Sequence, residues 1–324
     1  MATDPGGRSR VAIPAEFDDI VIWAAWLYYE QGLNQSDIAQ TIGVSRASVV
    51  NYLQEARERG VVRISMDPGV MAQQSLARGL AGRFGLAEAL VVPVAPGSDN
   101  QQRLAALGAA GARQLERMLT PGETLCVSWG KTVLAVADAI SQPVEGVTVA
   151  QVTGAAPGNR DFSAELCTAI LARNLGAVSK VMHAPAVLSD ARLCEALRRE
   201  PVISQQFALI RAAQTILFGI GSMGPDSTMR IADIASAEEI NAYAAAGAEA
   251  VLICRFLDAA GRQVRREFDQ RMMGIELDEL KAIPRRICVA GGLSKLGALR
   301  AALQAGYISH LVTDVETASA LAEG

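Results

Sequence analysis

The stretch Gln35–Gln54 reads QSDIAQTIGVSRASVVNYLQ and has the pattern of two short helices joined by a tight turn. Ala39 is small where the two helices must approach closely, and Gly43 stands where such a turn needs a positive φ. Ser45 is suited to cap the second helix, because its hydroxyl can accept a hydrogen bond from a free backbone N–H. The stretch therefore predicts a helix-turn-helix.

The second helix of this motif, expected over 46–59, would turn a polar face away from the apolar residues that join the helices. Arginine can bind guanine bidentately, and asparagine or glutamine can bind adenine, so this face suits the major groove. Gln35 and Ser45 lie near helix N-termini and could instead bind phosphate oxygens. A motif used only for packing or dimerisation would not need such a face. The predicted DNA-binding residues are Gln35, Ser45, Arg46, Ala47, Val50, Asn51 and Gln54.

The residues around this motif divide the chain. A helix is expected over 18–31, and the alternation at 61–66 resembles a short strand. The predicted parts are a disordered lead over 1–17, a helix-turn-helix domain over 18–66, a linker helix over 67–84 and an effector-binding domain over 85–324.

The larger part alternates between apolar runs and amphipathic helices, of which the one expected over 99–119 is the clearest. The runs lie at 89–94, 124–129, 147–152, 180–184, 215–220, 250–256, 286–290 and 308–313. Because these runs are apolar on both faces, they predict a mainly parallel sheet covered by helices. The predicted fold is a small all-α domain followed by a larger α/β domain.

Composition limits the possible chemistry. The chain has 324 residues, 30 basic against 34 acidic side chains, two histidines and five cysteines without a C-x-x-C pair. No metal site and no cofactor are expected from this set. Scattered cysteines in odd number are typical of reduced thiols, and no apolar run approaches the roughly 18 residues of a membrane helix, so a cytoplasmic protein is expected.

A series of different short motifs follows in a fixed order along the chain. They are Leu27–Tyr29, Gly32–Gln35, Ile38–Ala39, Gly43–Arg46, Ala56–Gly60, Ser128–Thr132, Ala184–Ala186, Gly219–Ser222, Arg255–Asp258, Ala290–Gly292 followed by Lys295, and Leu311–Asp314. From about residue 18 onward, this ordered set resembles the SorC family of sugar-responsive bacterial transcription regulators.

The resemblance implies a fold, partners and a role. The effector domain would be similar to the ribose-5-phosphate isomerase, glucosamine-6-phosphate deaminase and CoA-transferase folds. The chain would form a homo-oligomer, as a tetramer, that binds double-stranded operator DNA and responds to a sugar, polyol or sugar phosphate. It would repress a carbohydrate or polyol operon. Residues 1–66 carry six basic and eight acidic side chains, so we expect this module to need oligomerisation for affinity.

The effector site is expected beyond the carboxyl ends of the parallel strands, where open sheets bind ligands. Gly130 would let the backbone approach an anion at a helix N-terminus, and Lys131 could add charge, although a lysine there is more often solvated. The predicted effector-binding residues are Ser128, Gly130, Lys131, Thr132, Gln151, Thr153, Gly154, Gly221, Ser222 and Lys295.

One departure from the family pattern concerns the ligand. Ala250–Val251 stand where the family usually carries Gly-Asp, and Cys254 stands where glycine is common. The missing carboxylate would normally be able to accept a ligand hydroxyl, so a different effector, such as a smaller polyol, is indicated.

Two enzyme readings compete with a regulator. The shared fold allows a sugar-phosphate isomerase with Glu165, Asp226 or Asp258 as base, but these carboxylates form no compact constellation in the sequence. Gly219–Gly224 matches G-x-G-x-x-G, yet Pro225 follows where a dinucleotide fold needs an apolar helix. No catalytic residue is predicted.

Overall fold

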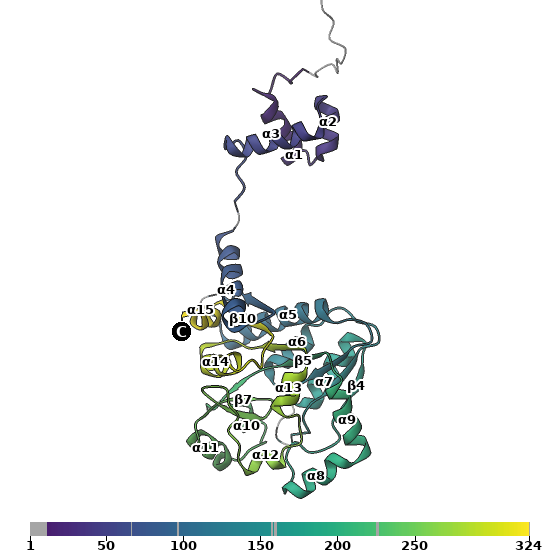
Figure 1. Cartoon of the computed structure of the whole chain (residues 1–324), viewed down its shortest axis with the longest axis vertical. Helices are drawn as coiled ribbons and strands as arrows, with labels where there is room; N and C mark the ends of the chain where they lie inside the picture. Colours follow the sequence, from purple (N-terminus) through teal and green to yellow (C-terminus); the bar gives the residue numbers. More distant parts are fainter. Residues whose placement is uncertain are drawn as a thin grey trace, which may run out of the picture. The chain divides into compact units, whose positions relative to one another are not determined.

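The computed structural model describes residues 12–65, 67–95, 97–156, 158, 161–224 and 227–323. The chain divides into two compact units, Met1–Pro68 and Gly69–Gly324 (Figure 1). Of the predicted lead, residues 1–11 lie outside the described residues.

The first unit consists of α1 (Ile20–Tyr29), α2 (Gln35–Ile42) and α3 (Arg46–Glu58). Side chains cap all three helices: Asp19, Asn34 and Ser45 accept hydrogen bonds from backbone N–H groups of the first turns. Gly43 ends α2 with φ 75°, in the left-handed region that favours glycine. These local signals explain why the helices begin and end within two residues of the predicted positions.

The ends of this unit differ from the sequence prediction. Phe17, assigned to the lead, packs its ring against Trp23 and Trp26 and so belongs to the core of the first unit. The predicted strand over 61–66 is wrong for 61–65, which form neither helix nor strand; Met66 lies outside the described residues. Val61 and Ile64 are exposed. Alternation alone does not make a strand when no neighbouring strand supplies hydrogen bonds.

The second unit is built on a seven-stranded sheet in the order β1-β10-β9-β5-β2-β3-β4, and every neighbouring pair is parallel. The strands are β1 (Glu88–Val92), β2 (Thr124–Val127), β3 (Thr148–Gln151), β4 (Val178–Lys180), β5 (Thr215–Phe218), β9 (Arg285–Val289) and β10 (His310–Asp314). The predicted parallel sheet is therefore confirmed. The run expected over 180–184 is a strand only at its first residue.

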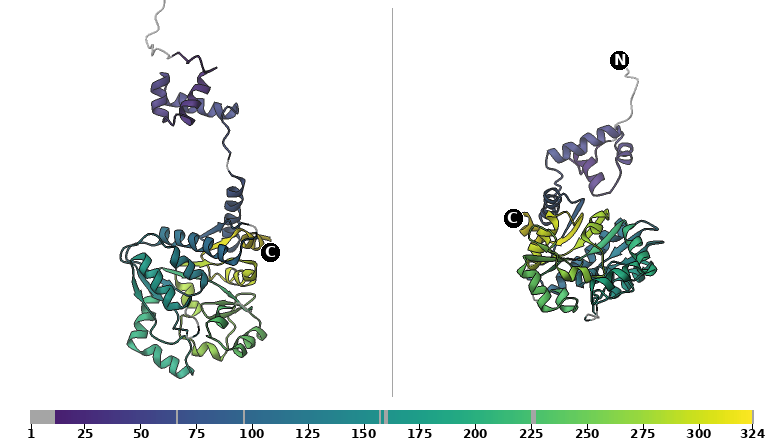
Figure 2. Two further views of the ribbon diagram at one scale, coloured as in Figure 1. Left: turned by 180° about the vertical axis from the view of Figure 1, so that it is seen from behind. Right: turned by 60° about the horizontal axis from the view of Figure 1, so that its bottom comes forward.

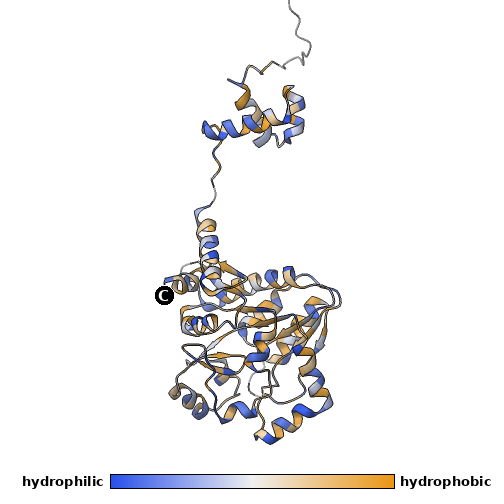
Figure 3. Ribbon diagram, viewed as in Figure 1, coloured by the Kyte–Doolittle hydropathy of each residue, from blue (hydrophilic) through white to orange (hydrophobic). Residues whose placement is uncertain are grey.

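Helices cover both faces of this sheet (Figures 1 and 2). They are α4 (Pro68–Phe84), α5 (Asn100–Met118), α6 (Lys131–Ala139), α7 (Ala164–Leu175), α8 (Ala191–Arg199), α9 (Pro201–Arg211), α13 (Leu277–Ala282), α14 (Leu296–Gln304) and α15 (Val315–Glu323). Leu125 and Val127 of β2 pack in the core beneath α5, α6 and α7, whereas Cys126 between them joins the core beneath α9 and α14. The strands are thus buried on both sides, and Figure 3 shows them mostly in the orange of apolar residues.

A second, three-stranded antiparallel sheet was not anticipated. It contains β6 (Gly221–Ser222), β7 (Ala248–Leu252) and β8 (Arg255–Asp258), flanked by α10 (Thr228–Ile231), α11 (Ala237–Ala245) and α12 (Glu267–Arg271). The single strand expected over 250–256 is wrong, because the chain turns at Ile253 and Cys254 with φ of 49° and 61°. Two positive φ values at non-glycine residues give no sequence signal for a turn.

The packing of α5 on α6 predicts a sharp difference between two helical glycines. A Cβ at Gly108 of α5 would lie 2.6 Å from the backbone oxygen of Ala135, whereas a Cβ at Gly79 of α4 would meet no described atom within 4 Å. We expect Gly108→Ala to lower the free energy of unfolding by about 1–3 kcal/mol. The matched control Gly79→Ala should raise it by about 0.4–1 kcal/mol. Urea unfolding of the full chain measures both, and equal stability of the two variants would contradict this packing.

Candidate functional site

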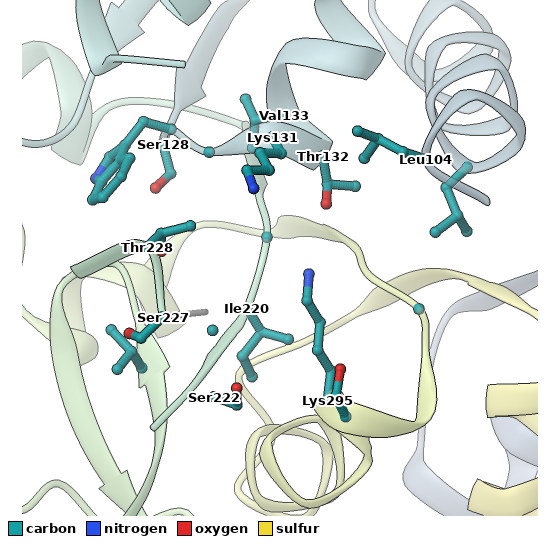
Figure 4. Close-up of a pocket in the computed structure, with 18 of the residues that line it drawn as sticks. Leu104, Ser128, Lys131, Thr132, Val133, Ile220, Ser222, Ser227, Thr228 and Lys295 are labelled. Atoms are coloured by element: carbon teal, nitrogen blue, oxygen red, sulfur yellow. The ribbon is translucent and has the colours of Figure 1, made fainter. Parts of the chain in front are cut away.

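A pocket of about 370 Å³ lies at the carboxyl end of the central sheet (Figure 4). Its walls come from the segments that follow β1, β2, β5 and β9, together with the β7–β8 turn. Because parallel strands all end at the same edge of a sheet, these distant segments meet there. The volume is in the range of pockets that hold small molecules.

The segment after β2 forms one wall and opens directly into α6. Gly130 is the N-cap of α6, with φ 123°, and no side chain caps the helix. The first N–H groups of a helix have no partner within it and carry partial positive charge, so they favour an anion. A Cβ at Gly130 would meet no described atom within 4 Å, which places this backbone beside open space.

Two lysines bring positive charge into the pocket. Lys131 begins α6, and Lys295 ends the short 3₁₀ helix Leu293–Lys295; their ammonium groups point toward one another in Figure 4. Burial lowers the pKa of Lys295, and the charge of Lys131 lowers that pKa further. Lys131 also lies 5.6 Å above the centre of the Phe162 ring. Two facing ammonium groups repel each other, so a negatively charged ligand between them would be stabilised by both.

A third cation, Arg103 of α5, also lines the pocket, but acidic partners hold it. Its Nη2 lies 2.7 Å from Glu316 Oε2, and its Nε lies 3.6 Å from the buried carboxylate of Asp314. Asp314 accepts in turn from the backbone N–H of Gly292 at 2.9 Å. Among the described lining residues there is no aspartate or glutamate, so the lysine charges face no acid there.

The remaining walls are of two kinds. Hydroxyl groups line one part, from Ser128, Thr132, Ser222, Ser227, Thr228 and Ser294. The other part is the apolar turn of the small sheet, with Val251, Ile253 and Cys254. Burial raises the pKa of the Cys254 thiol to about 11. Where the family pattern has an aspartate, Val251 therefore presents an apolar side chain to the pocket.

The sequence-predicted effector residues fall into two groups. Seven of them line this pocket: Ser128, Gly130, Lys131, Thr132, Gly221, Ser222 and Lys295. Gln151, the last residue of β3, and Thr153 and Gly154, which follow it, do not line the pocket. The side chains of Gln151 and Thr153 are fully buried, and Gln151 Nε2 donates to the Thr153 carbonyl at 2.7 Å.

The third residue of that group, Gly154, is pressed against other backbone. A Cβ at this position would collide with the carbonyl oxygens of Ala184 and Pro185. This close approach explains the glycine without a ligand. The chain after β3 therefore fills space under the segment 184–185 instead of opening into the pocket.

Sequence reasoning missed Arg103, Ser227, Ile253 and the apolar role of Val251. The signal for Arg103 was present, because α5 follows β1 and the rule for carboxyl ends of strands applies to β1 as well. Ser227 and the β7–β8 turn come from the small sheet, which the pattern of apolar runs did not reveal.

The predicted DNA-binding residues share one solvent-accessible surface of the first unit. Ser45, Arg46, Ala47, Val50, Asn51 and Gln54 are exposed, and Gln35 is half-buried. Arg46 Nε donates to Gln35 Oε1 at 3.3 Å, which links the starts of α2 and α3. Arg59, the C-cap of α3, forms ion pairs with Asp19 and Glu55.

The geometry does not support the enzyme readings. The segment Gly219–Gly224 contains β6, which pairs with β7, and the next helix, α10, has only four residues, unlike the long helix that a dinucleotide site requires. Asp258 pairs with Arg262 at 2.8 Å, and neither Asp258 nor Glu165 lines the pocket; Pro225 and Asp226 lie outside the described residues. No set of three potential metal ligands gathers in the part of the chain that the structure describes. Within the same residues, each helix is too short or too polar to cross a membrane.

Known proteins match nearly the whole chain. Residues 69–323 match the family model described as "Putative sugar-binding domain". The chain is 33% identical to "Uncharacterized transcriptional regulator YjhU" of Escherichia coli K12, with 94% of each chain covered. It is 31% identical to the transcriptional regulator LsrR of Enterobacter sp. 638, over 94% of this chain and 93% of the relative.

A solved structure covers both units. The full-length sorbitol operon regulator SorC of Klebsiella pneumoniae is 28% identical, with a TM-score of 0.74, 93% of this chain covered and 97% of that chain. These proteins are transcriptional regulators, which supports the prediction that the chain is not an enzyme. With the sugar-binding model matched over most of its length, the chain belongs to the SorC family of sugar-responsive transcriptional regulators.

Proposed function

We propose that this protein represses a carbohydrate or polyol operon, and that a phosphorylated sugar or polyol bound in the pocket controls its hold on operator DNA. The observation that carries the proposal is the pair of facing lysines, Lys131 and Lys295, beside the uncapped N-terminus of α6. A phosphate dianion would neutralise both ammonium groups and accept hydrogen bonds from the helix N–H groups.

Size and polarity favour a small carbohydrate for the rest of the ligand. The pocket of about 370 Å³ is lined by six hydroxyl side chains, by the two lysines and by the apolar side chains of Val251 and Ile253. Such a site suits a molecule with one charged end and several hydroxyl groups along a short carbon chain. Effector control of DNA binding is a coupling between two sites, typically worth about 1–3 kcal/mol.

Removal of either lysine charge tests the proposed anion site. We expect Lys131→Gln and Lys295→Gln each to weaken binding of sugar phosphates and of inorganic phosphate by about 1.5–3 kcal/mol, because each removes a charge-assisted hydrogen bond. Lys180→Gln on the exposed strand β4 removes the same charge away from the pocket and serves as control. Isothermal titration calorimetry measures the affinities, and unchanged binding in both pocket variants would rule out the anion site.

The pH dependence of anion binding has a defined sign. The pKa of Lys295 lies below its usual value, so its charge is lost earlier than that of an exposed lysine as the pH rises. A bound anion stabilises the charged form, so affinity should fall as the pH rises toward the usual pKa of lysine, and the fall should begin at a lower pH than for an exposed lysine. Inorganic sulfate is the suitable probe, because it does not titrate in this range. Lys295→Gln should flatten the profile, and an equally steep profile in that variant would show that another group titrates.

The exposed face of α3 is the proposed reader of operator DNA. We expect Arg46→Ala to cost about 1–3 kcal/mol of operator binding and to relax sequence preference, since the guanidinium would contact a base edge. Arg57→Ala should weaken operator and unrelated DNA alike, with a shallower salt dependence, as expected of a phosphate contact. Fluorescence anisotropy over a salt series separates the two, and a variant Arg46→Ala with unaltered specificity would refute this docking.

The low charge of the first unit supports an oligomeric regulator, and the five scattered cysteines support a cytoplasmic one. Six basic and eight acidic residues over 1–66 provide little non-specific attraction to DNA. Several helix-turn-helix domains in one assembly would therefore be needed for tight binding to the operator. We expect a tetramer, the assembly that the family resemblance implies. Multi-angle light scattering should give four times the mass of one chain, and a monomer at micromolar concentration would contradict the proposal.

A further inference from the structure

One hydroxyl group in the pocket is buried without a partner. Ser227 is 3% exposed and lines the pocket, and among the described residues its Oγ has no hydrogen-bond partner. A buried hydroxyl without a partner is unfavourable, so such groups in folded proteins usually satisfy a ligand, a water molecule or a neighbouring backbone group. Figure 4 places Ser227 beside Thr228.

The local structure gives Ser227 no other role. It stands at the N-cap of α10, a position where serine normally accepts a hydrogen bond from the first turn, but its side chain makes no capping bond. The serines at the N-caps of α3, α7 and α11 (Ser45, Ser163 and Ser236) all make that bond. Ser227 is therefore the exception among the serine N-caps that the structure describes.

The surroundings fix what this hydroxyl could bind. The lysines and the α6 N-terminus occupy the positively charged part of the pocket, while Ser227 follows the small sheet on another wall. A neutral hydroxyl can donate and accept one hydrogen bond with a second hydroxyl, and the apolar turn beside it at Val251 and Ile253 can contact C–H groups. This combination matches a hydroxylated carbon chain better than a second anion.

We propose that Ser227 recognises a hydroxyl group on the carbon chain of the effector and makes the pocket selective for sugar or polyol phosphates over phosphate alone. The inference rests on the proposed anion site at the two lysines. It assigns the two ends of the ligand to different walls: the phosphate to α6 and Lys295, and the hydroxylated carbon chain to Ser227.

The test compares ligands with and without a carbon chain. The probes are inorganic phosphate, D-ribose 5-phosphate, D-xylulose 5-phosphate, erythritol 4-phosphate and D-sorbitol 6-phosphate, titrated calorimetrically into the full chain. At least one sugar or polyol phosphate should bind the unsubstituted protein more tightly than inorganic phosphate. In Ser227→Ala, the affinity for that ligand should fall about tenfold, whereas the affinity for inorganic phosphate should change less than twofold.

Ser236→Ala is the matched control, because Ser236 caps α11 with its side chain at 3.1 Å. It should lower the melting temperature and leave every affinity unchanged. Ser227→Ala should show the reverse: an unchanged or higher melting temperature without ligand, since no capping bond is lost, together with the weaker sugar-phosphate binding. This double contrast separates ligand recognition from a structural role.

Several results would overturn the inference. Undiminished sugar-phosphate affinity in Ser227→Ala would do so, as would an equal loss for inorganic phosphate, which would indicate a deformed pocket. Equal affinity of the unsubstituted protein for inorganic phosphate and for every sugar and polyol phosphate would also exclude recognition of the carbon chain. If the unsubstituted protein bound none of the probes, inorganic phosphate included, the result would contradict the proposed anion site at the lysines and therefore also the proposed role of Ser227.

Discussion

The parallel direction of all seven strands in the central sheet is the constraint on which the site depends. Every strand ends at the same edge, so segments that follow β1, β2, β5 and β9 meet although they are far apart in sequence. The sheet is buried on both faces by helices, which fixes the strands from both sides. Loops on such a scaffold can vary in chemistry without loss of the core, and this is where a sensor can specialise.

The edge of the sheet where the strands end carries positive electrostatic potential. The α6 N-terminus, Lys131 and Lys295 place positive potential in one region, and Arg103 beside them is already neutralised by Asp314 and Glu316. Burial is the main cause that lowers the pKa of Lys295, so the surroundings of this ammonium group disfavour its charge. The binding of an anion would relieve a cost that the folded protein already bears, so part of the ligand affinity is built into the unliganded structure.

Local chemistry explains how much of this was predictable from sequence. The helix-turn-helix was predicted closely, because Asn34, Gly43 and Ser45 act within their own few residues. The parallel sheet followed from runs that are apolar on both faces. The β7–β8 turn was missed because Ile253 and Cys254 adopt positive φ without any glycine, which only the surrounding contacts can enforce.

The residues of the candidate site could be predicted only where their immediate neighbours in sequence carry a signal. Gly130 and Lys131 indicate a turn from a strand into a helix, and Lys295 follows two glycines, Gly291 and Gly292, that indicate another turn. Gln151, Thr153 and Gly154 carry the same kind of signal, yet their segment is covered by residues 184–185, a contact between distant parts of the chain that no local pattern encodes. Ser227 could not be recognised either, because only the structure shows that its hydroxyl makes no capping bond.

The glycine contact between α5 and α6 has a mechanical consequence. Both helices begin at the pocket, and at Gly108 and Ala135 their backbones lie too close for even a methyl group. Helices in such close contact cannot slide or tilt independently, so the two pocket walls that they form behave as one rigid body. The small antiparallel sheet supplies a wall of the pocket that takes no part in this contact, at a turn where Ile253 and Cys254 adopt positive φ.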